Sequence, residues 1–476
     1  MGRVTWAVFR LAAGPAIALG IVFAQVQKPP AANSPGPCQA PMASRARADR
    51  AFDYTGTGSC AAVACHGGIA PLAGSRILRN EFTTWASDDP HSRAFQVLLS
   101  GSSKQIVRKL AGNKAGEIPA YEDQRCLACH TTPLPGGTLR ERSGLGQDGV
   151  GCESCHGPAE AWLGKHTTYE WAQNPDQKSS LGFSETKNLV RRVSLCVECH
   201  VGQHSSADAR FPRRDVNHDL IAAGHPRLTF EFASYLDNYP HHWKPDGDEK
   251  AGNYPAKAWA IGQVATARAA LELLRDRAGS RLDPWPEFSE YGCFSCHHSL
   301  RDEAWRRQRA TAGVPSGAPE WGSWPFTLSR DLGETLDLGE DWKAFVVSLD
   351  QLKAEMVRLD SDRTRVIKQA DQAASPLNRS LDRLDSMSLN QRTIERLIQA
   401  IDGKEAWKGV NGWDQAAQRY LAIVPLRQAL IRLDPGRRQA MQPLKTRLES
   451  LLRKLRFPEG LDSPRGFDPT PLWGLH

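Results

Sequence analysis

Five pairs of cysteines, each followed directly by a histidine, constrain this 476-residue chain more than any other feature. Four pairs have two residues between the cysteines, in the segments CLACH, CESCH, CVECH and CFSCH. The first pair, within GTGSCAAVACHGGIAP, has four. Ten of the eleven cysteines fall in these pairs, which leaves Cys38. Since about 3% of the residues are histidines, five such coincidences have a probability on the order of 10⁻⁸.

The pattern Cys-x-x-Cys-His is typical of covalent haem attachment. The two thiols add to the vinyl groups of one haem, and the adjacent histidine supplies the proximal nitrogen to iron. Zinc sites and disulfides do not require a histidine behind every second cysteine. We therefore expect five c-type haems, numbered in chain order, whose thioether cysteines and proximal histidines are Cys60, Cys65 and His66; Cys126, Cys129 and His130; Cys152, Cys155 and His156; Cys196, Cys199 and His200; and Cys293, Cys296 and His297.

The first motif has three interpretations: a haem site with a longer spacer, a zinc half-site, or a disulfide-bearing loop. A disulfide between Cys60 and Cys65 would leave His66 without a role. The spacer AAVA is small enough to loop out between two thioether anchors. The sequence therefore favours the first of five haem sites.

The second axial ligands of the haem irons are expected to be histidines. Methionine occurs only at positions 1, 42, 356, 387 and 441, so the span 56–300 that carries every motif contains none. Because Met/His ligation raises haem potentials, its absence predicts a low-potential set with two histidines per iron, with one open site as the alternative. The predicted distal ligands are His91, His166, His218, His225 and His242.

Three further histidines, His204, His241 and His298, are less suited to this role. His298 cannot reach the far face of the haem held by its neighbour His297, and His204 lies in a polar run just after His200. The choice between His241 and His242 stays open, with the following Trp243 favouring His242 because an indole can pack against a haem edge.

The N-terminal segment predicts export to the periplasm. Arg3 and Arg10 precede an apolar run from Leu11 to Ala24, so residues 1–24 are expected to be a signal peptide, with an uncleaved anchor as the alternative. Residues 25–50, rich in Pro, Ala and Ser, predict a flexible linker. Cys38 in this linker lacks the preceding apolar residue of a lipidation site, so a free or partnered thiol is expected.

The net charge is consistent with haem binding. It is +7 and falls to +5 when the signal peptide is removed, while each ferric haem adds about −1. The basic excess is thus assigned to haem propionates rather than to nucleic acid. Arg210, Arg213, Arg214 and Arg227 are candidate propionate partners, with a solvated surface position as the alternative for each.

The haem region is expected to span residues 51–300, with short helices and long loops around the macrocycles. The clearest helix covers residues 255–279, with Pro255 in its first turn and Gly279 at its end. Residues 301–340 contain Gly, Pro and Trp with little periodicity, which predicts a linker.

A helical bundle is predicted for residues 341–457, followed by a tail over 458–476. Its first helix carries the apolar stripe Phe345, Leu349, Leu352, Met356 and Leu359. Ser388 and Gln391 suggest a capping box for a second helix that ends at Gly403, and further helices are expected near 413–433 and 444–455. The predicted fold class is mainly α with long loops, in which the bundle either stabilises the haem domain or docks it to a respiratory complex.

Residues 51–300 resemble the cytochrome c-552/4 family of multihaem cytochromes, which is related to the tetrahaem electron acceptor of hydroxylamine oxidoreductase and, more distantly, to multihaem nitrite reductases. The resemblance rests on CESCHGPAEAWLGKH, which ends at His166, on DPHSRAF around His91, and on HDLIAAGHPRLTFE with His218 and His225. It covers about half the chain and implies haems stacked in close pairs that carry electrons in the periplasm. The fifth site and the longer first spacer depart from a tetrahaem pattern.

The sequence thus predicts a periplasmic electron-transfer protein of a respiratory chain, which exchanges electrons with redox partner proteins. The alternative is an oxidoreductase of small nitrogen or sulfur compounds with one open haem site. The chain has no Cys-x-x-Cys-Lys, the catalytic haem motif of the nitrite reductases. We therefore expect electron transfer rather than catalysis and assign no catalytic residue.

Overall fold

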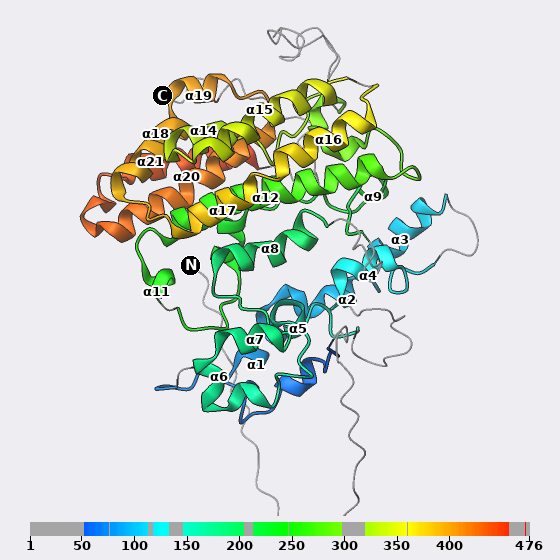
Figure 1. Cartoon of the computed structure of the whole chain (residues 1–476), viewed down its shortest axis with the longest axis vertical. Helices are drawn as coiled ribbons and strands as arrows, with labels where there is room; N and C mark the ends of the chain where they lie inside the picture. Colours follow the sequence, from blue (N-terminus) through cyan, green and yellow to red (C-terminus); the bar gives the residue numbers. More distant parts are fainter. Residues whose placement is uncertain are drawn as a thin grey trace, which may run out of the picture. The chain divides into compact units, whose positions relative to one another are not determined.

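Helices are the regular elements of this protein in the part of the chain that the computed structural model describes (Figure 1). That part comprises residues 52–75, 77–112, 118–132, 146–203, 213–245, 247–297, 319–358 and 360–456, together with Leu472. Within it, extended pairing is limited to two isolated bridges, Gln203 with Arg214 and Tyr291 with Trp321. The predicted fold class is confirmed.

Several predictions fall outside the described residues. They concern the signal peptide, the linker with Cys38, most of the C-terminal tail, His204, Arg210 and His298. Among the helices that the structure does describe, none has the length and apolar character needed to cross a membrane.

The motif-bearing region consists mostly of short helices joined by long loops, with η marking 3₁₀ helices. They are η1 (Thr57–Cys60), α1 (Glu81–Asp88), η2 (Pro90–Arg93), α2 (Ala94–Val97), α3 (Gly101–Leu110), α4 (Gln124–His130), α5 (Cys152–His156), η3 (Lys165–Thr167), α6 (Tyr169–Gln173), α7 (Pro175–Ser180), α8 (Leu189–His200), α9 (His218–Ala223), α10 (Phe232–Asn238), α11 (Gly247–Lys250), α12 (Tyr254–Gly279), η4 (Phe288–Glu290) and η5 (Cys293–Ser295).

The C-terminal part holds longer helices that pack side by side (Figure 1). They are α14 (Ser329–Leu336), α15 (Gly339–Met356), α16 (Arg363–Ala374), α17 (Leu377–Ser386), α18 (Gln391–Asp402), α19 (Lys404–Lys408), α20 (Trp413–Leu433), η6 (Pro435–Arg438) and α21 (Gln442–Leu455). Part of the expected linker 301–340 is therefore helical, and Leu332 and Leu336 of α14 are buried.

The predicted apolar stripe of α15 is buried at Phe345, Leu349, Leu352 and Met356, whereas Leu359 lies outside the described residues. The capping box predicted at Ser388 is wrong. Asn390 caps α18, because its side chain accepts the backbone N–H of Thr393 and it directly precedes the first helical residue. Gly403 follows the last residue of α18, as expected.

Helix α12 connects the motif-bearing region to the bundle. Its alanine-rich sequence favours a helix, and Pro255 fits the first turn, where no backbone donor is needed. The helix contacts α8 and α10 on one side and α14, α16, α17 and α20 of the bundle on the other. Because Trp259, Ile261 and Leu271 are fully buried, α12 lies inside the core rather than on its surface.

The apolar core is distributed unevenly along the chain. One continuous cluster joins Leu189, Val193 and Val197 of α8 to α12 and to the bundle. The other cluster among the described residues, Phe95, Leu98, Val107, Ala120 and Leu127, contains only five side chains. A segment as long as residues 52–188 needs a larger apolar interior than this to fold alone.

Arg277 of α12 forms ion pairs with two segments that lie close to the fifth motif. Its guanidinium, which is buried, pairs with Asp215, three residues before His218, and with Glu290, three residues before Cys293. Replacing a buried arginine leaves its carboxylate partners charged and unpaired, which is costlier than removing an exposed pair.

We expect Arg277→Ala to lower the free energy of unfolding by about 3–5 kcal/mol, measured by urea unfolding followed by circular dichroism. The matched control is Arg330→Ala, because Arg330 and Asp350 form an ion pair whose side chains are 60% and 53% exposed. It should cost less than about 1 kcal/mol. Equal losses in both variants would contradict this role of Arg277.

Candidate functional site

Three of the five motifs lie at the ends of helices. α4 ends at His130, α5 runs from Cys152 to His156, and α8 ends at His200. Residues at positions i, i+3 and i+4 lie on one helix face, so both cysteines and the histidine of each motif point the same way. In the first motif η1 ends at Cys60, and in the fifth η5 begins at Cys293.

The ten motif cysteines are free thiols in the structure. Cys65, Cys155 and Cys296 are exposed, and the others are partly buried. Among the described residues, no group of three or more His, Cys, Asp or Glu side chains is arranged to hold a metal ion on its own. The zinc interpretation of the first motif therefore has no ligand cluster in that part of the chain, where a structural zinc site would need four ligands.

Four of the five proximal histidines face a predicted distal histidine from a distant part of the sequence. The ring centres are 6.1 Å apart for His66 and His166, 6.0 Å for His200 and His91, 6.4 Å for His130 and His225, and 6.5 Å for His297 and His218. A metal–imidazole nitrogen distance is about 2 Å and a ring centre lies about 1 Å behind its nitrogen, so two imidazoles on one iron have centres about 6 Å apart.

The remaining pair, at the third motif, is His156 and His242. The two imidazoles are electrostatic neighbours, and the Nδ1 atom of each is buried with no hydrogen-bond partner in the described part of the chain. His241 is exposed instead, and its Nε2 lies 3.1 Å from the carbonyl oxygen of Leu236. The structure thus brings His242, and not His241, to the third motif.

Hydrogen bonds at Nδ1 orient five of the ten imidazoles. The acceptors are Glu81 for His66 and Asp89 for His91, each at 2.9 Å, and backbone carbonyls of Ala94 for His130, Leu163 for His166 and Pro226 for His225. A histidine that donates from Nδ1 presents an unprotonated Nε2, which is the tautomer that binds a metal. The hydrogen-bond network assigns this tautomer to all five.

Burial keeps two proximal histidines neutral. It lowers the pKa of His156 to about 4, and the nearby His242 acts in the same direction. It also lowers the pKa of His200 to about 4, with His91 contributing. By contrast, the hydrogen bond to Glu81 raises the pKa of His66. A neutral imidazole has the free lone pair that a metal ligand requires.

A glycine allows close packing beside His156. Gly157 has a positive φ of 79°, and a Cβ atom there would lie 2.1 Å from the carbonyl oxygen of Gly182. The close approach of these two backbone segments places the ring of Phe183 on His156, with the ring centres 5.8 Å apart. The third motif therefore has an apolar wall beside its proximal histidine.

Residues between the motif cysteines join the motifs in pairs. Glu153 of the third motif accepts hydrogen bonds from the backbone N–H groups of Thr55 and Gly56, just before the first motif. Arg214 bonds to the carbonyl oxygen of Ala128 in the second motif and to Glu198 in the fourth. The first and third motifs thus form one linked pair, and the second and fourth form another.

Contacts between cysteines give the same order. The thiols of Cys60 and Cys152 lie close enough to shift each other's pKa, as do those of Cys129 and Cys199, and Cys155 and Cys196 are electrostatic neighbours. The motifs therefore follow one another in space as first, third, fourth and second. The fifth adjoins the second, because its proposed distal ligand His218 begins α9 and His225 follows the end of that helix.

The candidate propionate partners already have carboxylate partners in the chain. Arg213 pairs with Asp215, Asp276 and Asp283, Arg214 with Glu198, and Arg227 with Asp414 of α20. These arginines therefore hold segments of the chain together, and their pairing with haem propionates stays a prediction.

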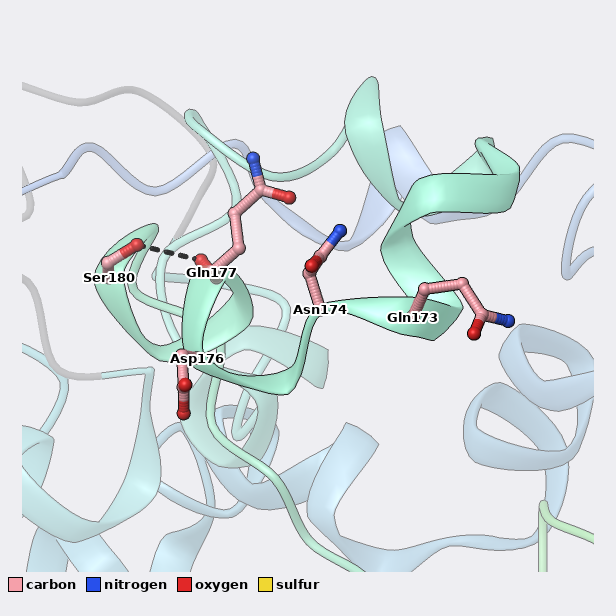
Figure 2. Close-up of a pocket in the computed structure, with 5 residues that line it drawn as sticks. All are labelled: Gln173, Asn174, Asp176, Gln177 and Ser180. Atoms are coloured by element: carbon pink, nitrogen blue, oxygen red, sulfur yellow. Dashed lines mark hydrogen bonds between the residues drawn. The ribbon is translucent and has the colours of Figure 1, made fainter.

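A surface pocket is lined by residues outside the five motifs. Figure 2 shows it between α6 and α7, lined by Gln173, Asn174, Asp176, Gln177 and Ser180, with a volume of about 680 Å³. Its lining is polar and contains no cysteine or histidine. Nothing in this pocket resembles the donor set of the five motifs.

The residues present fit haem at five places. Each place combines two thiols with two imidazoles, which is the donor set of a covalently attached haem with two histidine ligands. Glu81, Asp89 and Glu153, which no sequence motif singles out, also support these sites through hydrogen bonds. Asp89 can still be recognised from the local sequence, because an aspartate two residues before a histidine can cap the turn that holds the histidine.

Comparison with known proteins agrees with the motifs. The family model described as cytochrome c554 and c-prime matches residues 59–157, which hold the first three motifs. Cytochrome c-554 of Nitrosomonas europaea is 37% identical over 182 residues, which cover 34% of this chain and 69% of that protein. No solved structure matches the chain. The chain belongs to the cytochrome c-554 family of multihaem c-type cytochromes.

Proposed function

We propose that this protein is a periplasmic electron carrier with five c-type haems, each held by two histidines. The observation that carries the proposal is the 6.0–6.5 Å separation of the ring centres in four proximal–distal pairs. This is the spacing that one iron between two imidazoles requires. The electrostatic proximity of His156 and His242 supports the ligand pair proposed for the third haem.

The proposed ligand pairs combine residues far apart in the sequence. They are His66 with His166 at the first haem, His130 with His225 at the second, His156 with His242 at the third, His200 with His91 at the fourth, and His297 with His218 at the fifth. Bound haem iron would exchange single electrons between its ferric and ferrous forms. Since two histidines occupy both axial positions, no ligand has to move during this exchange.

The chain's own groups would keep these sites in sequence. Glu153 ties the first site to the third, and Arg214 ties the second to the fourth. The resulting order of neighbouring sites, first, third, fourth, second and fifth, gives electrons a continuous route. Redox partner proteins would then exchange electrons at its ends, in the periplasm that we propose as the location of the protein.

For the helical bundle we propose a stabilising role. The fourth motif ends α8, whose Val193 and Val197 belong to the same core as the bundle. Beside the fifth motif, Arg227 contacts Cys293 and forms two hydrogen bonds to Asp414 of α20. The bundle thus supports the fourth and fifth sites directly.

We expect a reduced pyridine-haem spectrum of the mature protein to give five haems per chain. The double variant Cys60→Ala, Cys65→Ala should give four, because the first haem then has no thioether anchor. A wild-type value clearly different from five, or a double variant with its full haem content, would refute the proposed count.

The third ligand pair predicts different outcomes for two neighbouring histidines. His242→Ala should convert one ferric haem from low spin to high spin in the electron paramagnetic resonance spectrum, because it removes the sixth ligand. His241→Ala is the matched control and should leave all haems low spin, since His241 is exposed and bonded to a backbone carbonyl.

The reverse pattern, or no high-spin signal in either variant, would disprove the pairing of His156 with His242. The wild-type protein serves as the reference, and its low-spin spectrum should not change when nitrite or hydroxylamine is added. A wild-type high-spin signal that shifts with either compound would favour the oxidoreductase alternative.

A further inference from the structure

The proposed haem ligands differ in what their Nδ1 atoms contact. His66 and His91 donate to carboxylates, and His130, His166 and His225 donate to backbone carbonyls. His156 and His242 have no carboxylate acceptor: their Nδ1 atoms are buried without a well-formed hydrogen bond in the described part of the chain, and the backbone of Pro240 lies close to His242. The first, third and fourth sites therefore have different electrostatic surroundings despite the same ligand type.

Among the proposed ligands, Asp89 is hydrogen-bonded directly to His91, and it acts on His242 of the third site only through space. It is only 1% exposed, and its Oδ1 atom lies 2.9 Å from Nδ1 and 3.0 Å from the backbone nitrogen of His91. Tyr239 covers the same imidazole with ring centres 5.9 Å apart. A carboxylate so buried is weakly screened by water, so its charge acts strongly on the ring.

Glu81 has the equivalent position at the first site. Its Oε2 atom lies 2.9 Å from Nδ1 of His66, and its Oε1 atom accepts the backbone N–H of Leu78 at 2.8 Å. Two hydrogen bonds fix this side chain, which is 16% exposed. Glu81 is also the first residue of α1, where the helix dipole favours a negative charge.

A carboxylate acceptor changes the imidazole that donates to it. It draws the Nδ1 proton towards itself and increases the electron density at Nε2, so the ligand becomes a stronger donor to iron. Stronger donation and a nearby negative charge both favour the ferric form over the ferrous form, because the ferric ion carries the larger positive charge. A backbone carbonyl has a weaker effect, and a missing acceptor has none.

Building on the proposed function, we propose that Glu81 and Asp89 are positioning residues that lower the reduction potentials of the first and fourth haems below that of the third. The third site lies between the other two in the order of motif contacts. An electron entering this part of the route would therefore reside on the third haem before its two neighbours are reduced.

The test uses the full-length protein with its haems, in the single variants Asp89→Asn and Glu81→Gln. Both keep the size of the side chain and remove its charge. Asp88→Asn is the matched control, because Asp88 is exposed and directly precedes Asp89 in the sequence. A spectroelectrochemical titration would resolve the potentials of the individual haems, and electron paramagnetic resonance would record the low-spin signals.

Each test variant should raise the potential of one haem by at least about 59 mV, a tenfold change in its one-electron equilibrium, and shift the g values of one low-spin signal. Asp88→Asn should cause less than a third of that change. The conservative variant Asp89→Glu should restore a potential close to that of the wild type. A merely structural role for Asp89 would not produce this pattern.

This inference would be overturned if both test variants kept five low-spin haems and had the same potentials as Asp88→Asn. The proposed function would then still stand. If Asp89→Asn does not fold, Glu81→Gln decides the matter at the first site. A wild-type protein that lacks five low-spin haems would instead refute the proposed function on which the inference rests.

Discussion

The approach of two imidazole rings to about 6 Å, on opposite sides of a single iron, is the constraint on which the proposed arrangement depends. It draws together residues more than a hundred positions apart, such as His91 and His200, whose ring centres are 6.0 Å apart. The loops that carry these histidines have few apolar side chains of their own to bury. In our account, the ligand pairs supply the cross-links that a small apolar core cannot.

The second half of the molecule, by contrast, has an extensive apolar core of its own. α12 and the bundle form a large apolar core that needs no cofactor, and α8 carries this core up to the fourth motif. Buried ion pairs connect this core to the fifth motif: Arg277 pairs with Glu290, and Arg227 pairs with Asp414. The bundle therefore holds in place the helix and the loops that carry the fourth and fifth motifs.

The sequence predicted best what depends on local spacing. The motif cysteines and histidines follow a fixed pattern, and α12 follows from alanine content, Pro255 and Gly279. The pairing of distal histidines depends on tertiary contacts, so the sequence offered candidates without partners. The same limit applies to Arg214, whose hydrogen bonds to Glu198 and Ala128 join two motifs that the sequence does not connect. At α18, Asn390 and not Ser388 is the N-cap, because Asn390 directly precedes the first helical residue.

The most direct test of the central claim is a crystal structure of the mature holoprotein with anomalous diffraction recorded at the iron absorption edge. Our account predicts five iron positions, each between the two imidazoles of one proposed pair, with His156 and His242 on the iron of the third site. Fewer than five iron positions, or an iron whose sixth position is open or filled by another residue, would contradict it.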